Sequence, residues 1–129
     1  MGIANYFESD PHFTEQQEHE LARIANATRA IIDATLKYNA PQTEMTDVAS
    51  ALEALAARMQ PNAIARPMAY HNPVFKPHDA SWSAPYSPIC GRYHPSAPPM
   101  RMELKDDRAY GYATFTDAFE GPPNCVHGG

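Results

Sequence analysis

The stretch Met100-Arg101-Met102-Glu103-Leu104-Lys105-Asp106-Asp107 decides the C-terminal part of the fold, together with the eight residues that follow it. Apolar and charged residues alternate from Met100 to Lys105, which is the period of a half-buried strand. The paired aspartates predict a turn, and residues 108–115 predict the returning strand. Gly111 within that strand is typical of a bulge or of a close approach of another backbone. The pattern therefore predicts a β-hairpin over residues 100–115.

A loop rich in glycine and proline follows this hairpin, with the sequence Phe119-Glu120-Gly121-Pro122-Pro123-Asn124-Cys125-Val126-His127-Gly128-Gly129. A strand pair, a Gly-Pro-Pro loop and then His-Gly-Gly resembles the PaaI-like branch of the hotdog-fold thioesterase superfamily, and within it the group of the mitochondrial-type acyl-CoA thioesterases. The lead-in Ser87-Pro88-Ile89-Cys90-Gly91-Arg92, followed by Pro98-Pro99-Met100, is similar to that of many bacterial members. The resemblance covers residues 87–129.

This resemblance implies an acyl-CoA thioester hydrolase in which His-Gly-Gly leads into a long central helix. The N-terminus of a helix carries unpaired N–H groups and a partial positive charge. The N–H of Gly129 is then expected to donate to the thioester carbonyl oxygen and to stabilise the negative charge that grows there. Gly128 lets the substrate approach the backbone closely, and His127 orients the loop. Substrate contacts are expected from Glu120, Gly121 and Asn124.

Two further expectations concern the same loop. Cys125 is expected to be a small buried residue beside it and not the nucleophile. In the family, the catalytic Asp or Glu lies on the central helix after His-Gly-Gly, and these 129 residues hold no such carboxylate. We therefore expect the N-terminal part of a thioesterase, either a truncated product or one half of a split enzyme, that is inactive alone. A degenerate fragment with no function of its own is a further hypothesis. A complementing chain or a second copy is the expected protein partner, and no cofactor is implied.

Residues 1–60 predict two amphipathic helices joined by a short loop. Thr14 and Gln17 have the spacing of a capping box, and the first helix ends before Pro41. The second helix is expected to begin at Thr43 or Thr46 and to end at Pro61. Their apolar stripes have helical spacing and comprise Leu21, Ile24, Ala25, Thr28, Ile31, Ile32 and Leu36 in the first helix and Met45, Val48, Leu52, Leu55 and Met59 in the second.

Such a helical hairpin cannot bury either stripe with one helix alone. The two stripes must close on each other, on the rest of the chain, or on a partner subunit. A non-catalytic protein-interaction module that uses the helical hairpin is therefore the alternative function. The polar faces are not enriched in Lys and Arg, which disfavours a membrane surface as the partner.

Residues 61–99 contain nine prolines and predict an irregular, largely extended connection. Large apolar side chains within it predict that it lies along a folded surface; these are Tyr70, Phe75, Trp82, Tyr86, Ile89 and Tyr93. The expected fold class is thus α+β, with a helical hairpin in 1–60, a Pro- and aromatic-rich segment in 61–99, and the start of a hotdog domain in 100–129.

The composition and charge of the chain disfavour several classes of protein. A formal net charge of −5, with Lys and Arg scattered, disfavours a nucleic-acid partner. No apolar run is long enough to span a bilayer, and the two cysteines form no disulfide framework. The six histidines include pairs seven apart, His71 with His78 and His12 with His19, a spacing that fits no usual metal site. We expect a cytoplasmic protein without a metal.

Overall fold

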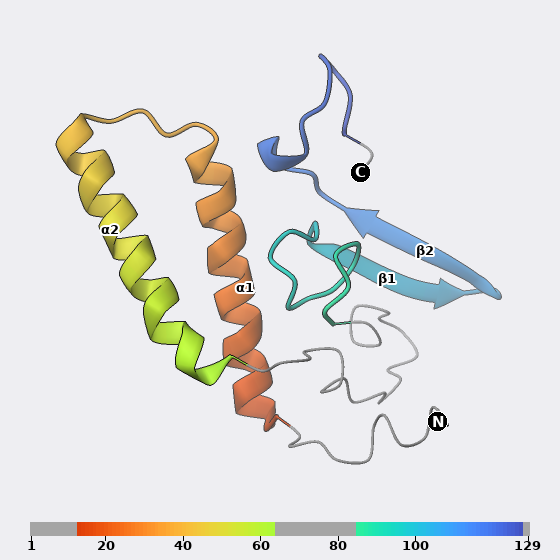
Figure 1. Cartoon of the computed structure of the whole chain (residues 1–129). Helices are drawn as coiled ribbons and strands as arrows, with labels where there is room; N and C mark the ends of the chain where they lie inside the picture. Colours follow the sequence, from red (N-terminus) through yellow and green to blue (C-terminus); the bar gives the residue numbers. More distant parts are fainter. Residues whose placement is uncertain (1–12, 64–84, 128–129) are drawn as a thin grey trace, which may run out of the picture.

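The computed structural model describes residues 13–63 and 85–127, and it has the predicted α+β class (Figure 1). Two helices, α1 (Glu15–Thr35) and α2 (Gln42–Met59), precede a short 3-10 turn, η2 (Gln60–Asn62). The strands β1 (Met100–Lys105) and β2 (Arg108–Ala113) follow, and then a second 3-10 turn, η4 (Asp117–Phe119). In Figure 1, α1 lies between α2 and the other described elements.

The start of α1 is fixed by the predicted capping box. The Gln17 amide donates to the Thr14 hydroxyl at 3.2 Å, and the Thr14 amide donates to Oε1 of Gln17 at 2.9 Å. These two bonds satisfy backbone donors that the first turn of a helix leaves free. The helix ends at Thr35, one residue before the last position of the predicted stripe.

The predicted start of α2 was wrong. The helix begins at Gln42 with Pro41 as its N-cap, so Thr43 and Thr46 lie inside it. The fixed backbone of proline suits the entry of a helix, and the Thr46 hydroxyl donates to the Gln42 carbonyl at 3.0 Å instead of capping. The helix ends at Met59, and Pro61 falls in η2, as a proline-terminated helix predicts.

The predicted hairpin is present as a two-stranded antiparallel sheet. Asp106 and Asp107 have φ of 51° and 58°, which is the left-handed pair that a two-residue hairpin turn needs. The return strand ends at Ala113, two residues earlier than predicted. Gly111 pairs with Met102 in an unbroken ladder, so it marks no bulge.

The described core lies between α1 and residues 85–99. Its buried apolar members are Ala25 of α1 with Tyr93 and Ala97. The ring of Tyr86 packs against that of Tyr93 with centroids 5.5 Å apart. Burial, reinforced by the nearby carboxylate of Glu18, raises the pKa of Tyr93 to about 12.

The expectation of an extended connection was wrong for residues 85–99. They form successive turns, with the Gly91 amide donating to the Ser87 carbonyl and the Tyr93 amide to the Pro85 carbonyl, both at 2.8 Å. A Cβ on Gly91 would lie 2.5 Å from the Pro85 oxygen, so only glycine fits this turn. Residues 64–84, with Tyr70, Phe75 and Trp82, lie outside the described residues.

Candidate functional site

The loop predicted to contact substrate follows η4 and folds back on itself. We call residues 120–127 the terminal loop. The His127 amide donates to the Phe119 carbonyl at 2.8 Å and the Gly121 amide to the Cys125 carbonyl at 2.9 Å. An isolated antiparallel bridge joins Glu120 to Val126. The loop is therefore held closed by its own backbone.

Two residues of the terminal loop have a local role in this closure. A Cβ on Gly121 would lie 3.1 Å from the His127 nitrogen and 3.2 Å from the Cys125 oxygen, so a larger residue would push the two arms apart. Asn124 has φ of 66°, in the left-handed region, where asparagine is tolerated better than most residues. The structure thus gives Gly121 and Asn124 a part in shaping the loop.

The predicted site residues are only partly brought together. His127, Glu120 and Asn124 are all exposed, and Gly121 is half-buried between the two arms of the loop. Gly128 and Gly129, to which the resemblance assigns the central contacts, lie outside the described residues. Cys125 is exposed, which contradicts its expected burial, because no other described element packs over the loop at that point.

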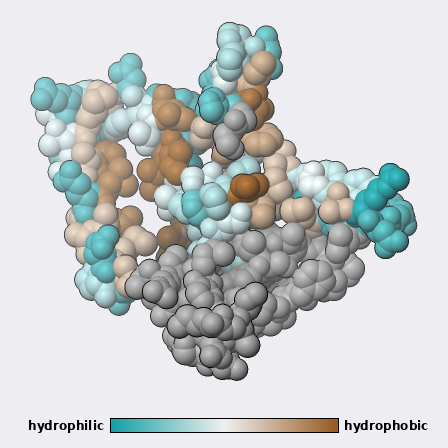
Figure 2. All heavy atoms as spheres, turned by 45° about the vertical axis from the view of Figure 1, so that its right-hand side comes forward, coloured by the Kyte–Doolittle hydropathy of each residue, from teal (hydrophilic) through white to brown (hydrophobic). Residues whose placement is uncertain are grey.

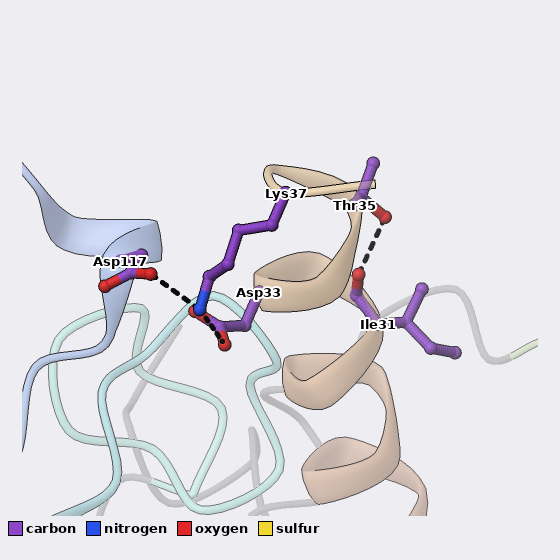
Figure 3. Close-up of polar contacts among 5 residues, drawn as sticks. All are labelled: Ile31, Asp33, Thr35, Lys37 and Asp117. Atoms are coloured by element: carbon purple, nitrogen blue, oxygen red, sulfur yellow. Dashed lines mark hydrogen bonds and ion pairs between the residues drawn. The ribbon is translucent and has the colours of Figure 1, made fainter. Parts of the chain in front are cut away.

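The loop is tied to the helices through η4. The ammonium of Lys37, just after α1, lies 2.6 Å from an Asp117 carboxylate oxygen and 3.3 Å from Asp33 (Figure 3). The hydrogen bond to Asp117, and to a smaller extent that to Asp33, raises the pKa of Lys37. The ring of Phe119 also meets that of Phe115 edge-on, with centroids 5.4 Å apart. The end of α1 and the base of the terminal loop are thereby joined.

A cavity of about 370 Å³ lies between α1 and the segment that leads to the terminal loop. Its lining is largely apolar and comprises Arg29, Ala30, Ile32, Asp33, Pro95, Ser96, Pro99, Thr116, Ala118 and Phe119. A volume of this size falls within the range of small-molecule sites. Of the predicted site residues that the structure describes, none lines it, so within residues 13–63 and 85–127 the cavity and the predicted loop meet at Phe119.

Arg29 makes five side-chain hydrogen bonds, and it was not among the residues predicted from the sequence. Its guanidinium donates to four backbone carbonyls, those of Gly91 and Arg92 at 3.2 Å and those of His94 and Ala97 at 2.9 Å. Burial lowers the pKa of Arg29. The sequence signal for this role was its position one helical turn after Ala25, which places Arg29 on the inner face of α1.

Residues 13–63 and 85–127 contain no group of three or more His, Cys, Asp or Glu side chains placed so that they could hold a metal ion. They also contain no helix with the length and apolarity that a membrane crossing needs. Three of the histidines considered as ligands, His12, His71 and His78, lie outside the described residues.

Comparison with known proteins identifies no relative. The chain matches no protein-family model and no curated protein, and its structure matches no solved structure.

Proposed function

We propose that residues 100–129 supply the first strand pair and the thioester-facing loop of a hotdog-fold acyl-CoA thioesterase. In this proposal, backbone N–H groups of the chain donate hydrogen bonds to the thioester carbonyl oxygen. A further segment, covalently attached or separate, provides the central helix with the catalytic carboxylate. The 129 residues alone are then inactive.

The observation that supports the proposal best is the closed terminal loop. The bond from the His127 amide to the Phe119 carbonyl holds the two arms of the loop together up to His127. Donors stabilise a developing oxyanion only when they are held in place before the reaction, and one such donor is worth about 10²- to 10³-fold in rate. A loop that closes without help from another element is consistent with this role.

The sheet supports the second part of the proposal, the need for a further segment. The described sheet has two strands, and an isolated pair is marginal in water. Tyr110 and Tyr112 are 38% and 50% exposed on one face of it. Added strands would pair with its free edges, and a central helix would cover one face.

The proposal is tested by supplying the missing segment. The DNA that follows the Gly129 codon is expected to encode, in one of its reading frames, an apolar helix with an acidic residue and further strands. Producing that segment with residues 1–129 should give hydrolysis of one or more acyl-CoA thioesters in a panel of chain lengths. Residues 1–129 alone should give none.

A His127→Ala variant of the completed protein should lose about tenfold or more in kcat/KM. The matched control is His19→Ala, because His19 is exposed on α1 and distant in sequence from the loop. Equal losses in the two variants would contradict a role for His127. Absence of any encoded helix, or of hydrolysis by a folded completed protein, would contradict the proposal as a whole.

A further inference from the structure

We propose that α2 is a dimerisation helix that packs antiparallel against α2 of a second copy of this chain. The inference is independent of the thioesterase proposal and concerns the helical hairpin. No residue of α2 is buried among the described residues. Its five large apolar side chains remain 38–48% exposed, and they are Met45, Val48, Leu52, Leu55 and Met59.

These five residues recur at steps of three and four, which is the heptad spacing of a helix–helix seam. Two large apolar residues of α1 are similarly open, Ile24 at 45% and Ile31 at 37%. Figure 3 shows Ile31 on the side of α1 opposite to Asp117 and η4. In Figure 2, apolar side chains gather on both helices along the gap that separates them. The helices of one copy therefore leave their seams largely uncovered.

The apolar arc of α2 is wider than one neighbouring helix covers. Alanines extend the seam on both sides, Ala49 and Ala56 on one and Ala51 on the other. A seam with a strict two-position repeat suits a pair of helices, whereas a broader arc is found in bundles. Small flanking residues also let helix backbones approach closely. The apolar arc of α2 is thus wide enough to receive a helix of a second copy.

The charges beside the arc favour a second copy in antiparallel orientation. Glu44 lies in the first turn of α2 and Arg58 in the last, on the same flank of the seam as Ala51. An antiparallel pair with Met45 opposite Leu55 and Val48 opposite Leu52 brings Glu44 near Arg58 of the other copy, twice by symmetry. The arrangement also sets opposite helix dipoles side by side.

Both charged groups have capacity for this contact. Glu44 accepts one hydrogen bond, from the Tyr38 hydroxyl at 3.2 Å, through Oε1. Arg58 is exposed and makes no ion pair with another residue of the described ranges. A parallel pair would place Glu44 and Arg58 of one copy on the opposite side of the seam from those of the other copy, so the two charges would not meet.

The size of the contact sets the expected affinity. The 18 residues of α2 make a helix about 27 Å long, and with an apolar face roughly 15 Å wide the buried area is on the order of 400 Å² per copy. Stable interfaces bury roughly 800 Å² per partner, so α2 alone predicts a weak dimer with a dissociation constant in the micromolar range. Contacts from α1 of the other copy would strengthen it.

Other occupants fit the seam less well. Residues 64–84 contain Pro67, Pro73 and Pro77, which interrupt any helix that would follow the heptad spacing of α2. Residues 1–12 contain one short apolar group, around Tyr6 and Phe7, against a seam of five large residues. A second copy presents a matching seam of the same length and the complementary charges.

Sedimentation equilibrium of the 129-residue chain tests the proposal. A mass of twice 14.3 kDa is expected at about 200 µM, with dissociation on dilution to about 1 µM. Leu52→Glu should abolish the dimer, because it places a charge at the centre of the seam. A monomer of 14.3 kDa at the higher concentration would overturn the proposal.

Charge reversal tests the orientation and does not depend on Leu52→Glu remaining folded. Glu44→Arg and Arg58→Glu should each raise the dissociation constant about tenfold, and the double variant should restore it to within about threefold. The control Glu53→Arg changes an exposed charge away from the seam and should leave the constant unchanged. If the double variant instead showed the combined increase in dissociation constant of the two single variants, the antiparallel arrangement would be overturned.

Discussion

At the scale of single residues, Arg29 organises the contact between α1 and residues 85–99. Four carbonyls of that segment turn inward to accept its hydrogen bonds, and Asn26 accepts a fifth at 2.6 Å. Among the described residues few apolar side chains are buried at this contact, so hydrogen bonds to the guanidinium form much of it. A planar group with five donors can satisfy this many acceptors, whereas a lysine cannot.

Replacing Arg29 by methionine should destabilise the protein by about 3 kcal/mol, because several partly buried carbonyls lose a charge-assisted donor. Arg29→Lys should recover only part of this loss. The free energy of unfolding in urea measures both effects. Arg23→Met serves as the matched control, since Arg23 is exposed and, within the described ranges, its partner is Glu20 of the same helix. A loss from Arg29→Met no larger than that of the control would contradict the role of Arg29.

Asn124 makes a separate prediction about the terminal loop. Its left-handed backbone conformation costs alanine about 1 kcal/mol more than asparagine or glycine. Asn124→Ala should therefore speed hydrogen exchange of the Gly121 and His127 amides about fivefold, while Asn124→Gly should leave it within about twofold. These amides are informative because they close the loop. Equal exchange in the alanine and wild-type proteins would show that φ at this position does not limit closure.

At the scale of elements, the joint between α1 and η4 rests on Lys37. Its ammonium, just after the end of α1, lies closer to Asp117 than to Asp33 in the last turn of α1. The ion pair is exposed, so its strength depends on geometry and on salt. It is nevertheless one of the few described contacts that tie the terminal loop to the helices.

Lys37→Gln should loosen η4 without unfolding α1. The amides of Phe119 and Glu120, which close η4, should exchange about two- to fivefold faster, and those within α1 should not change. The same acceleration is expected in the wild-type protein at high salt. Lys105→Gln, an exposed change on β1, is the control. Unchanged exchange at Phe119 in Lys37→Gln would contradict the proposed joint.

Elements with a local signal were predicted well from the sequence. The capping box of Thr14 and the alternation in Met100–Lys105 each depend on neighbours within four residues, and both features are present. The start of α2 was misplaced because a threonine and a proline both mark helix entries, and Pro41 prevailed. The length of β2 was overestimated because the apolar alternation continues to Phe115 beyond the last pairing residue.

At the scale of the whole molecule, the sequence was less informative because the decisive contacts join distant segments. Arg29 donates to the carbonyl of Ala97, 68 positions further along the chain. No local sequence pattern predicts that an arginine will bind several backbone carbonyls of a distant segment. The cavity beside Phe119 is assembled from α1, residues 95–99 and residues 116–119, so it too escaped prediction. The terminal loop was located because its glycines and prolines are contiguous, but the exposure of Cys125 depends on what else covers the loop.

The two proposals concern surfaces on opposite sides of α1. On one side, the terminal loop and the strand pair form a surface that further strands and a helix would complete. On the other side, α2 presents an apolar seam to a second copy. Both surfaces are open among the described residues, and each would gain stability from a partner.

The most direct test of the account is the rate at which acyl-CoA thioesters release free coenzyme A. Residues 1–129 are measured alone and joined to the segment encoded after Gly129. The account predicts no release above background for residues 1–129 alone and clear turnover, sensitive to His127→Ala, for the completed protein. Turnover by residues 1–129 alone, or none by a folded completed protein with any thioester of the panel, would contradict it.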